Sequence, residues 1–579
     1  MTEAPPPAPS DRDLASIQQA RELARRARVA QSALSEFSQE RTDAIIDAMA
    51  AAASAQAEAL ARLAVEETGF GVVEDKVRKN RFAAEDVHRA IRPQRTVGVI
   101  GRDETRRVVE IAEPFGVVAA IIPSTNPTST AIYKALISLK ARCAVVLSPH
   151  PSAERSITRT AEVLAAAARD AGAPDGAISC MTAVTLEGTQ ELMRRREVAV
   201  ILATGGLGLV RAAYSAGKPA YGVGPGNAPA YIERTADVVK AVRDVVTGKC
   251  FDNGVLCSSE NSVVVDAEIA AQVRAEFVRR GARFLSAVEA ESLARVLVTP
   301  QRLPNPALVG RSAQYIAEQA GFAVPPGTRV LIAELQGVGR DHPLSIEKLC
   351  PVLSYYVVKD WREGCERCKQ ILRYGGMGHT MAIHSRNEEV ILEFGLRKPA
   401  FRIVVNTPTS LGSIGLTTGL DPALTLGCGG FGGNITSDNI APRHLLNIKR
   451  LAYEVRPAPQ HEEEDARARE PHASPRVPAG LDPGRLAARI DQFLATRGYP
   501  RPAGESSPPA QTPPAPPAAM DAADVQGSVE PVVLDLDFVC EDDVRRAIRA
   551  GQRIRLAPGA IVTPAARDLA ASGHVFSSE

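Results

Sequence analysis

The sequence holds 579 residues, too many for one hydrophobic core, so three or four domains are expected. Apolar residues make up 45% and charged residues 23%, and 68 basic against 67 acidic residues leave a net charge of +1. This balance gives no electrostatic reason to expect a nucleic acid, and no apolar run is long enough for a membrane span. No secretory signal is visible at the amino terminus, and the nine scattered cysteines favour a reducing, cytoplasmic setting.

The amino-terminal part is predicted to be helical. Residues 1–10 are rich in Pro and Ala and are expected to form a disordered tail. From Asp11 to about Glu67 the sequence is Ala-rich with helical spacing of its apolar residues. Two strand-like runs, Arg95–Ile100 and Arg107–Ala112, flank a polar turn and predict a β-hairpin.

A strand–helix alternation follows the hairpin. Its predicted members are the strands Val117–Ile122, Ala144–Leu147 and Val198–Leu202 and the helices Ser129–Leu139 and Ile157–Ala171. Such alternation predicts a doubly wound α/β fold with ligands at the carboxyl ends of the strands. The Gly-rich turn Thr204–Gly208 opens another predicted helix, whose amino terminus could accept a pyrophosphate.

Two stretches carry candidate chemistry. In Lys249–Glu260 a Gly-containing turn delivers Cys257 just ahead of the predicted strand Val263–Val265, a suitable place for a nucleophile. The alternative is a buried structural thiol. In Glu113–Thr128 a strand ends at Asn126 between two prolines, and its side-chain amide could donate to a developing oxyanion.

These stretches resemble the aldehyde dehydrogenase superfamily and, within it, the CoA-acylating branch, over about Arg21 to Val455. The resemblance implies a Rossmann-like NAD-binding domain over 11–233, with the hairpin 95–112 used for oligomerisation. It also implies an α/β catalytic domain over 234–430 and a return segment or oligomerisation arm over 431–455. A homodimer or homotetramer is the assembly that it implies.

The resemblance also implies roles for particular residues. NAD would contact Thr125, Ser148, Pro149, His150, Thr204, Gly205, Gly206, Gly224, Glu347 and Leu349. Among these, Thr204–Gly206 would meet the pyrophosphate and Glu347 the nicotinamide ribose. Many members have Lys where Ser148 stands, so NADP remains an alternative to NAD. His379, in a segment characteristic of the acylating branch, could act on the CoA thiol as a base or donate to the hemithioacetal oxygen; the alternative is a His satisfied by backbone partners. No metal is expected.

Gly222 decides between two branches of the resembled superfamily. Hydrolytic members carry a Glu at this point, which activates the deacylating water. Without that base a CoA thiol is a far better nucleophile than water. The expected reaction converts a short-chain aldehyde, such as acetaldehyde or propanal, to acyl-CoA through a thioester on Cys257, with NAD and CoA. The alternatives are a hydrolytic dehydrogenase that releases a free acid and an inactive scaffold protein.

The sequence after Arg456 changes composition. Residues 456–528 are rich in Pro, Ala, Glu and Ser and predict a flexible linker. Within it, 482–498 predicts an amphipathic helix with Leu486, Ile490, Phe493 and Leu494 on one stripe, which resembles the encapsulation peptides of bacterial microcompartment enzymes. The alternative is a helix that docks onto its own enzyme.

Residues 529–579 predict a small α+β interaction module. Its predicted elements are a strand at 532–536, a helix at 541–550, a strand at 553–556, and a turn from Pro558 leading into a helix that ends at Ala570. It resembles segments of other microcompartment-associated proteins. Shell proteins are therefore the expected partners, and the microcompartment lumen is a candidate location within the cytoplasm.

Overall fold

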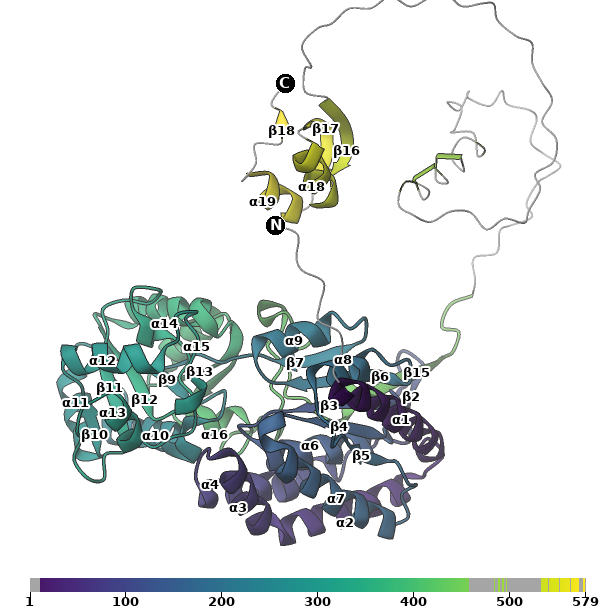
Figure 1. Cartoon of the computed structure of the whole chain (residues 1–579), viewed down its shortest axis with the longest axis horizontal. Helices are drawn as coiled ribbons and strands as arrows, with labels where there is room; N and C mark the ends of the chain where they lie inside the picture. Colours follow the sequence, from purple (N-terminus) through teal and green to yellow (C-terminus); the bar gives the residue numbers. More distant parts are fainter. Residues whose placement is uncertain are drawn as a thin grey trace, which may run out of the picture. The chain divides into compact units, whose positions relative to one another are not determined.

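The computed structural model describes residues 11–457, 533–539, 541–550, 552–562, 564–571 and 576–577, together with Gly484, Ala488, Arg489, Gln492, Phe493 and Thr496. The chain divides into two compact units, Met1–Gln460 and His461–Glu579 (Figure 1). Each unit is described by itself.

The amino-terminal helices confirm the helical prediction for 11–67 and extend it. They are α1 (Asp11–Leu34), α2 (Gln39–Ala55), α3 (Ala57–Thr68), α4 (Val73–Arg81), the π-helical turn η1 (Phe82–Asp86) and α5 (Val87–Ile91). The break after α1 has a local cause, because Ser38 caps α2 by accepting a hydrogen bond from the Arg41 N–H. Helix α4 was not predicted, since its sequence is strongly charged.

A five-stranded parallel sheet forms the centre of the first half of this unit. Its order is β5 (Ile178–Cys180), β4 (Val145–Pro149), β3 (Val117–Ile122), β6 (Val198–Thr204) and β7 (Ala220–Val223). Helices α6 (Pro127–Lys140) and α7 (Glu154–Asp170) cover one face, and α1 and α8 (Leu186–Arg194) cover the other (Figure 1). Every residue of β3 is buried, as expected for a strand covered on both faces. The doubly wound prediction is confirmed.

A seven-stranded parallel sheet forms the second half. Its order is β10 (Ala282–Phe284), β11 (Val330–Glu334), β12 (Val352–Val358), β9 (Glu260–Asp266), β8 (Ala228–Ile232), β13 (Gly378–His384) and β14 (Ala400–Val405). Along β9, Val263 and Val265 pack toward α10 (Val238–Cys250) and α11 (Ala270–Arg279), whereas Val264 packs toward the opposite face.

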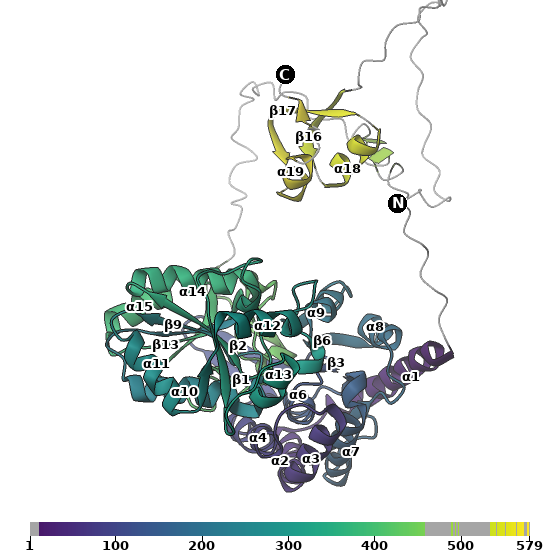
Figure 2. The same ribbon diagram turned by 60° about the vertical axis from the view of Figure 1, so that its left-hand side comes forward.

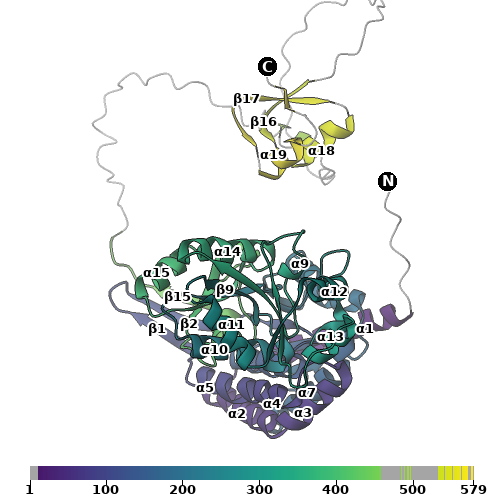
Figure 3. The same ribbon diagram turned by 90° about the vertical axis from the view of Figure 1, so that its left-hand side faces the viewer.

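The opposite face of this sheet is covered by α14 (Trp361–Gly375) and α15 (Glu388–Leu396) (Figures 2 and 3). The other α-helices of this unit are α9 (Leu207–Tyr214), α12 (Ala287–Leu297), α13 (Ala313–Gln319) and α16 (Thr409–Ser413). Strand β8 pairs with β9 and β13, so it belongs to this second sheet although the predicted first domain, 11–233, included it. The chain crosses between the sheets at Pro225 and Gly226, directly after β7.

The predicted hairpin is present as β1 (Gly98–Asp103) and β2 (Val108–Pro114). The late strand β15 (Leu446–Ala452) pairs with β2 to complete a three-stranded antiparallel sheet, which brings the segment 431–455 back to the hairpin. Leu451, Tyr453 and Val455 are exposed at its end. The oligomerisation role of this sheet stays a proposal.

The second unit contains a parallel sheet in the order β16 (Val533–Val539), β17 (Arg553–Val562) and β18 (Phe576–Ser577), with α18 (Glu541–Ala550) and α19 (Pro564–Ala571) between the strands. The turn predicted from Pro558 is wrong in its extent, because Ile561 and Val562 still pair with β16 and the helix begins only at Pro564. A register shift in the pairing accommodates the Pro-Gly step.

Parts of the predicted helix 482–498 lie within the described residues. The six described positions are helical, and Phe493 is 54% exposed. Leu486, Ile490 and Leu494 lie outside the described residues. Across the described ranges, no helix combines the length and apolar character that crossing a bilayer requires.

Candidate active site

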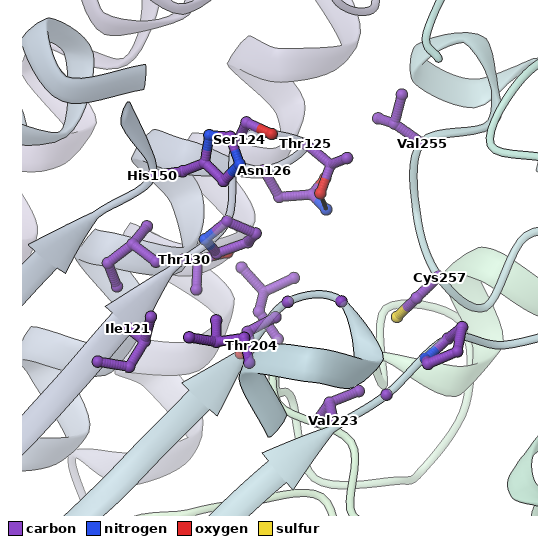
Figure 4. A pocket seen from close by; sticks show the side chains of 18 of the residues that line it. Ile121, Ser124, Thr125, Asn126, Thr130, His150, Thr204, Val223, Val255 and Cys257 are labelled. Carbon is purple, nitrogen blue, oxygen red and sulfur yellow. Dashed lines mark hydrogen bonds between the residues drawn. The ribbon is translucent and has the colours of Figure 1, made fainter. Parts of the chain in front are cut away.

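A cavity of about 430 Å³ lies where the carboxyl ends of β3, β4, β6 and β7 meet the loops that precede β9 and β12 (Figure 4). Of the predicted site residues, Thr125, Asn126, Pro149, His150, Thr204, Gly205, Gly206, Gly224, Cys257, Glu347 and Leu349 line it. Ser148 and His379 are not among the lining residues. The fold therefore gathers most of the predicted site from two sheets around one space.

Cys257 reaches the cavity through an unusual turn of backbone. The 3-10 turn η3 (Phe251–Gly254) follows α10, and Asp252, Asn253 and Gly254 within it have φ of +49°, +52° and +73°. Successive left-handed residues are costly for side chains other than glycine and cluster at functional sites. The turn aims the Cys257 sulfur into the cavity (Figure 4).

The Cys257 thiol is protonated at neutral pH in this environment. Burial and the neighbouring Glu347 and Cys428 raise its pKa to about 12, and the Arg402 guanidinium opposes that shift. The thiolate is the nucleophilic form of cysteine. Attack by Cys257 therefore requires loss of its proton in the presence of groups that stabilise the charge passed to the substrate.

Asn126 stands at the N-cap of α6, yet its side chain makes no capping hydrogen bond. Its Oδ1 instead accepts a hydrogen bond of 2.5 Å from Lys79 Nζ, and its Nδ2 donates to Thr125 Oγ1 at 3.2 Å. The amide N–H₂ group is thereby left on the side of the cavity wall. Lys79 was missed in the sequence, where its charged helix gave no reason to expect burial.

The amino terminus of α9 fits a pyrophosphate group. Gly206 is its N-cap and has open space where a Cβ would lie, whereas a Cβ at Gly205 would come within 2.7 Å of Leu209 Cδ2. The buried Thr204 Oγ1 has no hydrogen-bond partner among the described residues. An orphaned hydroxyl beside free helix N–H groups is suited to a dinucleotide phosphate.

Ser148 is not among the residues that line the cavity, whereas the neighbouring Pro149 and His150 are. Its wholly buried hydroxyl shares a 2.9 Å hydrogen bond with Oγ1 of Thr189, which does line the cavity. Four residues at the start of α8 also line the cavity and were missed: Val184, Thr185, Leu186 and Thr189. The sequence does contain a helix-start signal here, a threonine at the N-cap position. In the structure Thr185 caps α8 by accepting a hydrogen bond from the Gly188 N–H at 3.2 Å.

Glu347 lies in the loop before β12 and lines the cavity. Its Oε1 accepts a hydrogen bond of 2.7 Å from the Gly226 N–H, and burial raises the pKa of its carboxyl to about 7. Within the set of described lining residues, it is the one acidic side chain.

His379 lies behind the nucleophile. A Cβ on Gly226 would come within 2.2 Å of the Cys257 carbonyl oxygen and 3.1 Å of His379 Cγ, so the ring packs close to the Cys257 backbone. Its Nδ1 contacts Thr380 Oγ1 at 2.9 Å, and its buried Nε2 has no partner within the described part of the chain. Burial and Arg402 lower its pKa to about 3, which makes it a weak base, and a neutral ring carries a proton on only one of its two nitrogens.

Gly222 lies inside β7, and the space beside it is filled. A Cβ there would approach Tyr214 Oη to 2.6 Å and Val210 Cγ1 to 2.7 Å. The residue is buried and is not among those that line the cavity. A carboxylate side chain at this position would not reach the cavity without rearrangement of both neighbours.

The comparisons with known proteins agree with this architecture. The profile of the aldehyde dehydrogenase family matches residues 11–296. An acetylating aldehyde dehydrogenase from Geobacillus thermoglucosidasius is 50% identical, with a TM-score of 0.77, 78% of this chain covered and 100% of that chain. The chain belongs to the aldehyde dehydrogenase family.

Two further members of the aldehyde dehydrogenase family are informative. The bifunctional aldehyde-alcohol dehydrogenase AdhE of Escherichia coli K12 is 43% identical over 435 residues, which cover 74% of this chain and 49% of that protein. The chain thus spans about half the length of the bifunctional relative. A propionaldehyde dehydrogenase from the Clostridium phytofermentans fucose utilisation bacterial microcompartment is 28% identical, with a TM-score of 0.68, over 75% of this chain and 97% of that one.

Proposed function

We propose that this chain is an NAD-dependent, CoA-acylating aldehyde dehydrogenase that converts a short-chain aldehyde to acyl-CoA. The observation that carries the proposal is the shared cavity, in which Cys257 and Asn126 lie opposite a helix terminus suited to a dinucleotide, while position 222 offers no base. The relatives named as acetylating and as bifunctional aldehyde-alcohol dehydrogenases support it. Acetaldehyde and propanal are the substrates to test first.

The residues divide the reaction between them. The Cys257 thiol releases its proton to solvent as its sulfur attacks the aldehyde carbon, and the Asn126 amide with the Cys257 N–H stabilises the oxyanion of the hemithioacetal. NAD, when bound, supplies the acceptor for the hydride that leaves this carbon. The product is a thioester on Cys257. The CoA thiol then takes the acyl group, and the Cys257 sulfur is the leaving group.

Packing around β7 supports CoA over water as acyl acceptor. Gly222 carries no carboxylate, and Oε1 of Glu347, the acidic side chain among the described lining residues, accepts a hydrogen bond from the Gly226 N–H. Water needs a general base to attack a thioester at a useful rate, whereas a thiol is intrinsically more nucleophilic. His379 keeps an Nε2 without a partner among the described residues but does not line the cavity, so its role toward the CoA thiol or the hemithioacetal oxygen stays a prediction.

Turnover is expected to depend on CoA. With propanal and NAD but no CoA, NADH formation should stop after about one equivalent per active site, because the thioester accumulates. Adding CoA should restart it. Stopped-flow absorbance of NADH with product analysis provides the measurement. Sustained release of a free acid without CoA would favour the hydrolytic alternative, and no NADH with any aldehyde would favour the inactive scaffold.

The C-terminal unit is proposed to be a docking module for microcompartment shell proteins. All the described residues that line the cavity belong to the first unit. It has its own small core, formed by Val539, Val544, Ala547, Ile554, Ala566 and Ala570. A relative from a microcompartment supports this location. The antiparallel sheet β1-β2-β15 is proposed to join copies of the chain into a dimer or tetramer.

Removing the second unit should separate catalysis from placement. A chain truncated after Gln460 is expected to retain full CoA-dependent activity and to lose co-sedimentation with shell proteins of the same source. The control is the full-length chain with Phe493→Glu, which tests the helix alone. Retained co-sedimentation of the truncated chain would refute the docking role, and loss of activity would show that the tail belongs to the catalytic body.

A further inference from the structure

Three buried charged side chains, two lysines and one aspartate, lie beside the loop that carries Thr125 and Asn126. Lys76 and Lys79 project from α4 and Asp252 from η3, with exposed fractions of 1%, 2% and 0%. Both ammonium groups contact Asp252 Oδ2, that of Lys76 at 3.0 Å. Charged side chains are rarely buried so completely unless paired. Asp75, whose Oδ2 accepts from the Asp252 N–H at 2.7 Å, adds a second carboxylate to this group, so a role of the lysines beyond charge pairing needs a further contact.

The second contact of each lysine supplies it. Lys79 Nζ donates to Asn126 Oδ1 at 2.5 Å, and Lys76 Nζ donates to the Thr125 carbonyl at 3.2 Å. The two lysines thus hold consecutive residues of the loop that carries the proposed oxyanion donor. An asparagine at an N-cap ordinarily accepts a hydrogen bond from the helix backbone, and Asn126 does not.

Holding the amide oxygen has two chemical consequences. A side-chain amide has one acceptor end and one donor end, so fixing Oδ1 against Lys79 fixes Nδ2 on the other side. A cation on the carbonyl oxygen also withdraws electron density from the nitrogen, and polarised chains of hydrogen bonds strengthen the terminal donor. Asn126 is therefore both oriented and made a stronger donor.

Asp252 connects this arrangement to the nucleophile. It lies five positions before Cys257 in the chain and has a left-handed backbone, with φ of +49°. Its Oδ1 accepts from the Val72 N–H at 2.7 Å, and its own N–H donates to Asp75 Oδ2 at 2.7 Å. A Cβ on Gly71 would lie 1.8 Å from Asp252 Oδ1, so glycine at 71 makes room for the carboxylate.

We propose that Lys79 is a positioning residue that orients and polarises the Asn126 amide, and that Asp252 ties it to the loop of Cys257. This inference rests on the proposed function, because the donor matters for a developing oxyanion. Burial lowers the pKa of Lys79 to about 8, and Asp252 opposes that shift, which helps to retain the cation. Lys76 would still pair Asp252 in a chain that lacks Lys79.

A double-mutant cycle tests whether Lys79 acts through Asn126. Lys79→Met is expected to slow single-turnover NADH formation about 10- to 100-fold, within the range for weakening one oxyanion donor. In an Asn126→Ala background the same change should alter the rate by less than about twofold, because residues that act through one another are not additive. Arg78→Met, on the exposed side of α4, is the matched control and should leave the rate unchanged. The inference would be overturned if the double variant lost activity by the product of the two single losses, or if Lys79→Met alone left the rate unchanged.

A second variant and a structural readout keep the test decisive. Lys79→Arg retains the cation, and it should fold and lose less activity than Lys79→Met, again only where Asn126 is present. A crystal structure of Lys79→Met should show Asn126 Oδ1 turned to cap α6, and an amide left in place would contradict the inference. The crystal structure needs no aldehyde. If the unmodified chain formed no NADH, the proposed function would be refuted, while the orientation of Asn126 by Lys79 could still be tested.

Discussion

Replacing Cys257 by serine is expected to abolish aldehyde-dependent NADH formation while the fold and NAD binding stay intact. A hydroxyl is a far poorer nucleophile than a thiolate, and no other thiol replaces it in the wall of the cavity, as far as the described residues show. The loss should be at least about 10³-fold in kcat, the order expected when a catalytic nucleophile is removed. Initial rates, thermal unfolding and NAD titration provide the measurements.

Cys250→Ser is the matched control for this change. Cys250 is partly buried at the end of α10, its Sγ lies 3.5 Å from the Arg329 carbonyl, and it does not line the cavity. Its replacement should be nearly silent. An active Cys257→Ser chain together with an inactive Cys250→Ser chain would place the nucleophile at the other end of the loop.

Asn126→Ala should lower kcat about 10²–10³-fold with little change in NAD affinity, because the donor acts on charge that develops only during reaction. Asn387→Ala is the matched control, since Asn387 is also an N-cap but makes the ordinary bonds, accepting from Glu389 N–H at 3.1 Å and Val390 N–H at 3.2 Å. Asn387→Ala should lower the free energy of unfolding by about 1 kcal/mol and leave the turnover number unchanged. Steady-state kinetics and denaturant unfolding distinguish the two, and equal kinetic effects would remove Asn126 from the site.

Local patterns predicted the strands and helices where burial is uniform. The apolar run Val117–Ile122 is strand β3 to the residue, because a strand covered on both faces has no polar positions to blur its ends. The boundary at 233 was less accurate, since β8 is equally apolar and only its pairing with β9 and β13 assigns it to the second sheet. The sequence of a single strand does not show which distant strand it pairs with.

The candidate site was predictable as far as it follows strand ends. Cys257 and Asn126 fall on loops next to buried strands, and both line the cavity. Lys79 could not be predicted, because its burial depends on Asp252, which is 173 positions away in the chain. Ser148 and His379 were expected in the wall, but whether a side chain on an all-buried strand faces a ligand or a neighbouring helix depends on packing.

The packing beside Gly222 has a consequence for how this site can change over generations. Tyr214 and Val210 occupy the volume that any side chain at position 222 would need. A glutamate introduced there would meet a steric penalty, and its carboxylate would reach the cavity only after Tyr214 and Val210 had moved or been replaced by smaller residues. A single substitution at position 222 is therefore expected to lower the stability of the fold before it supplies a base for water.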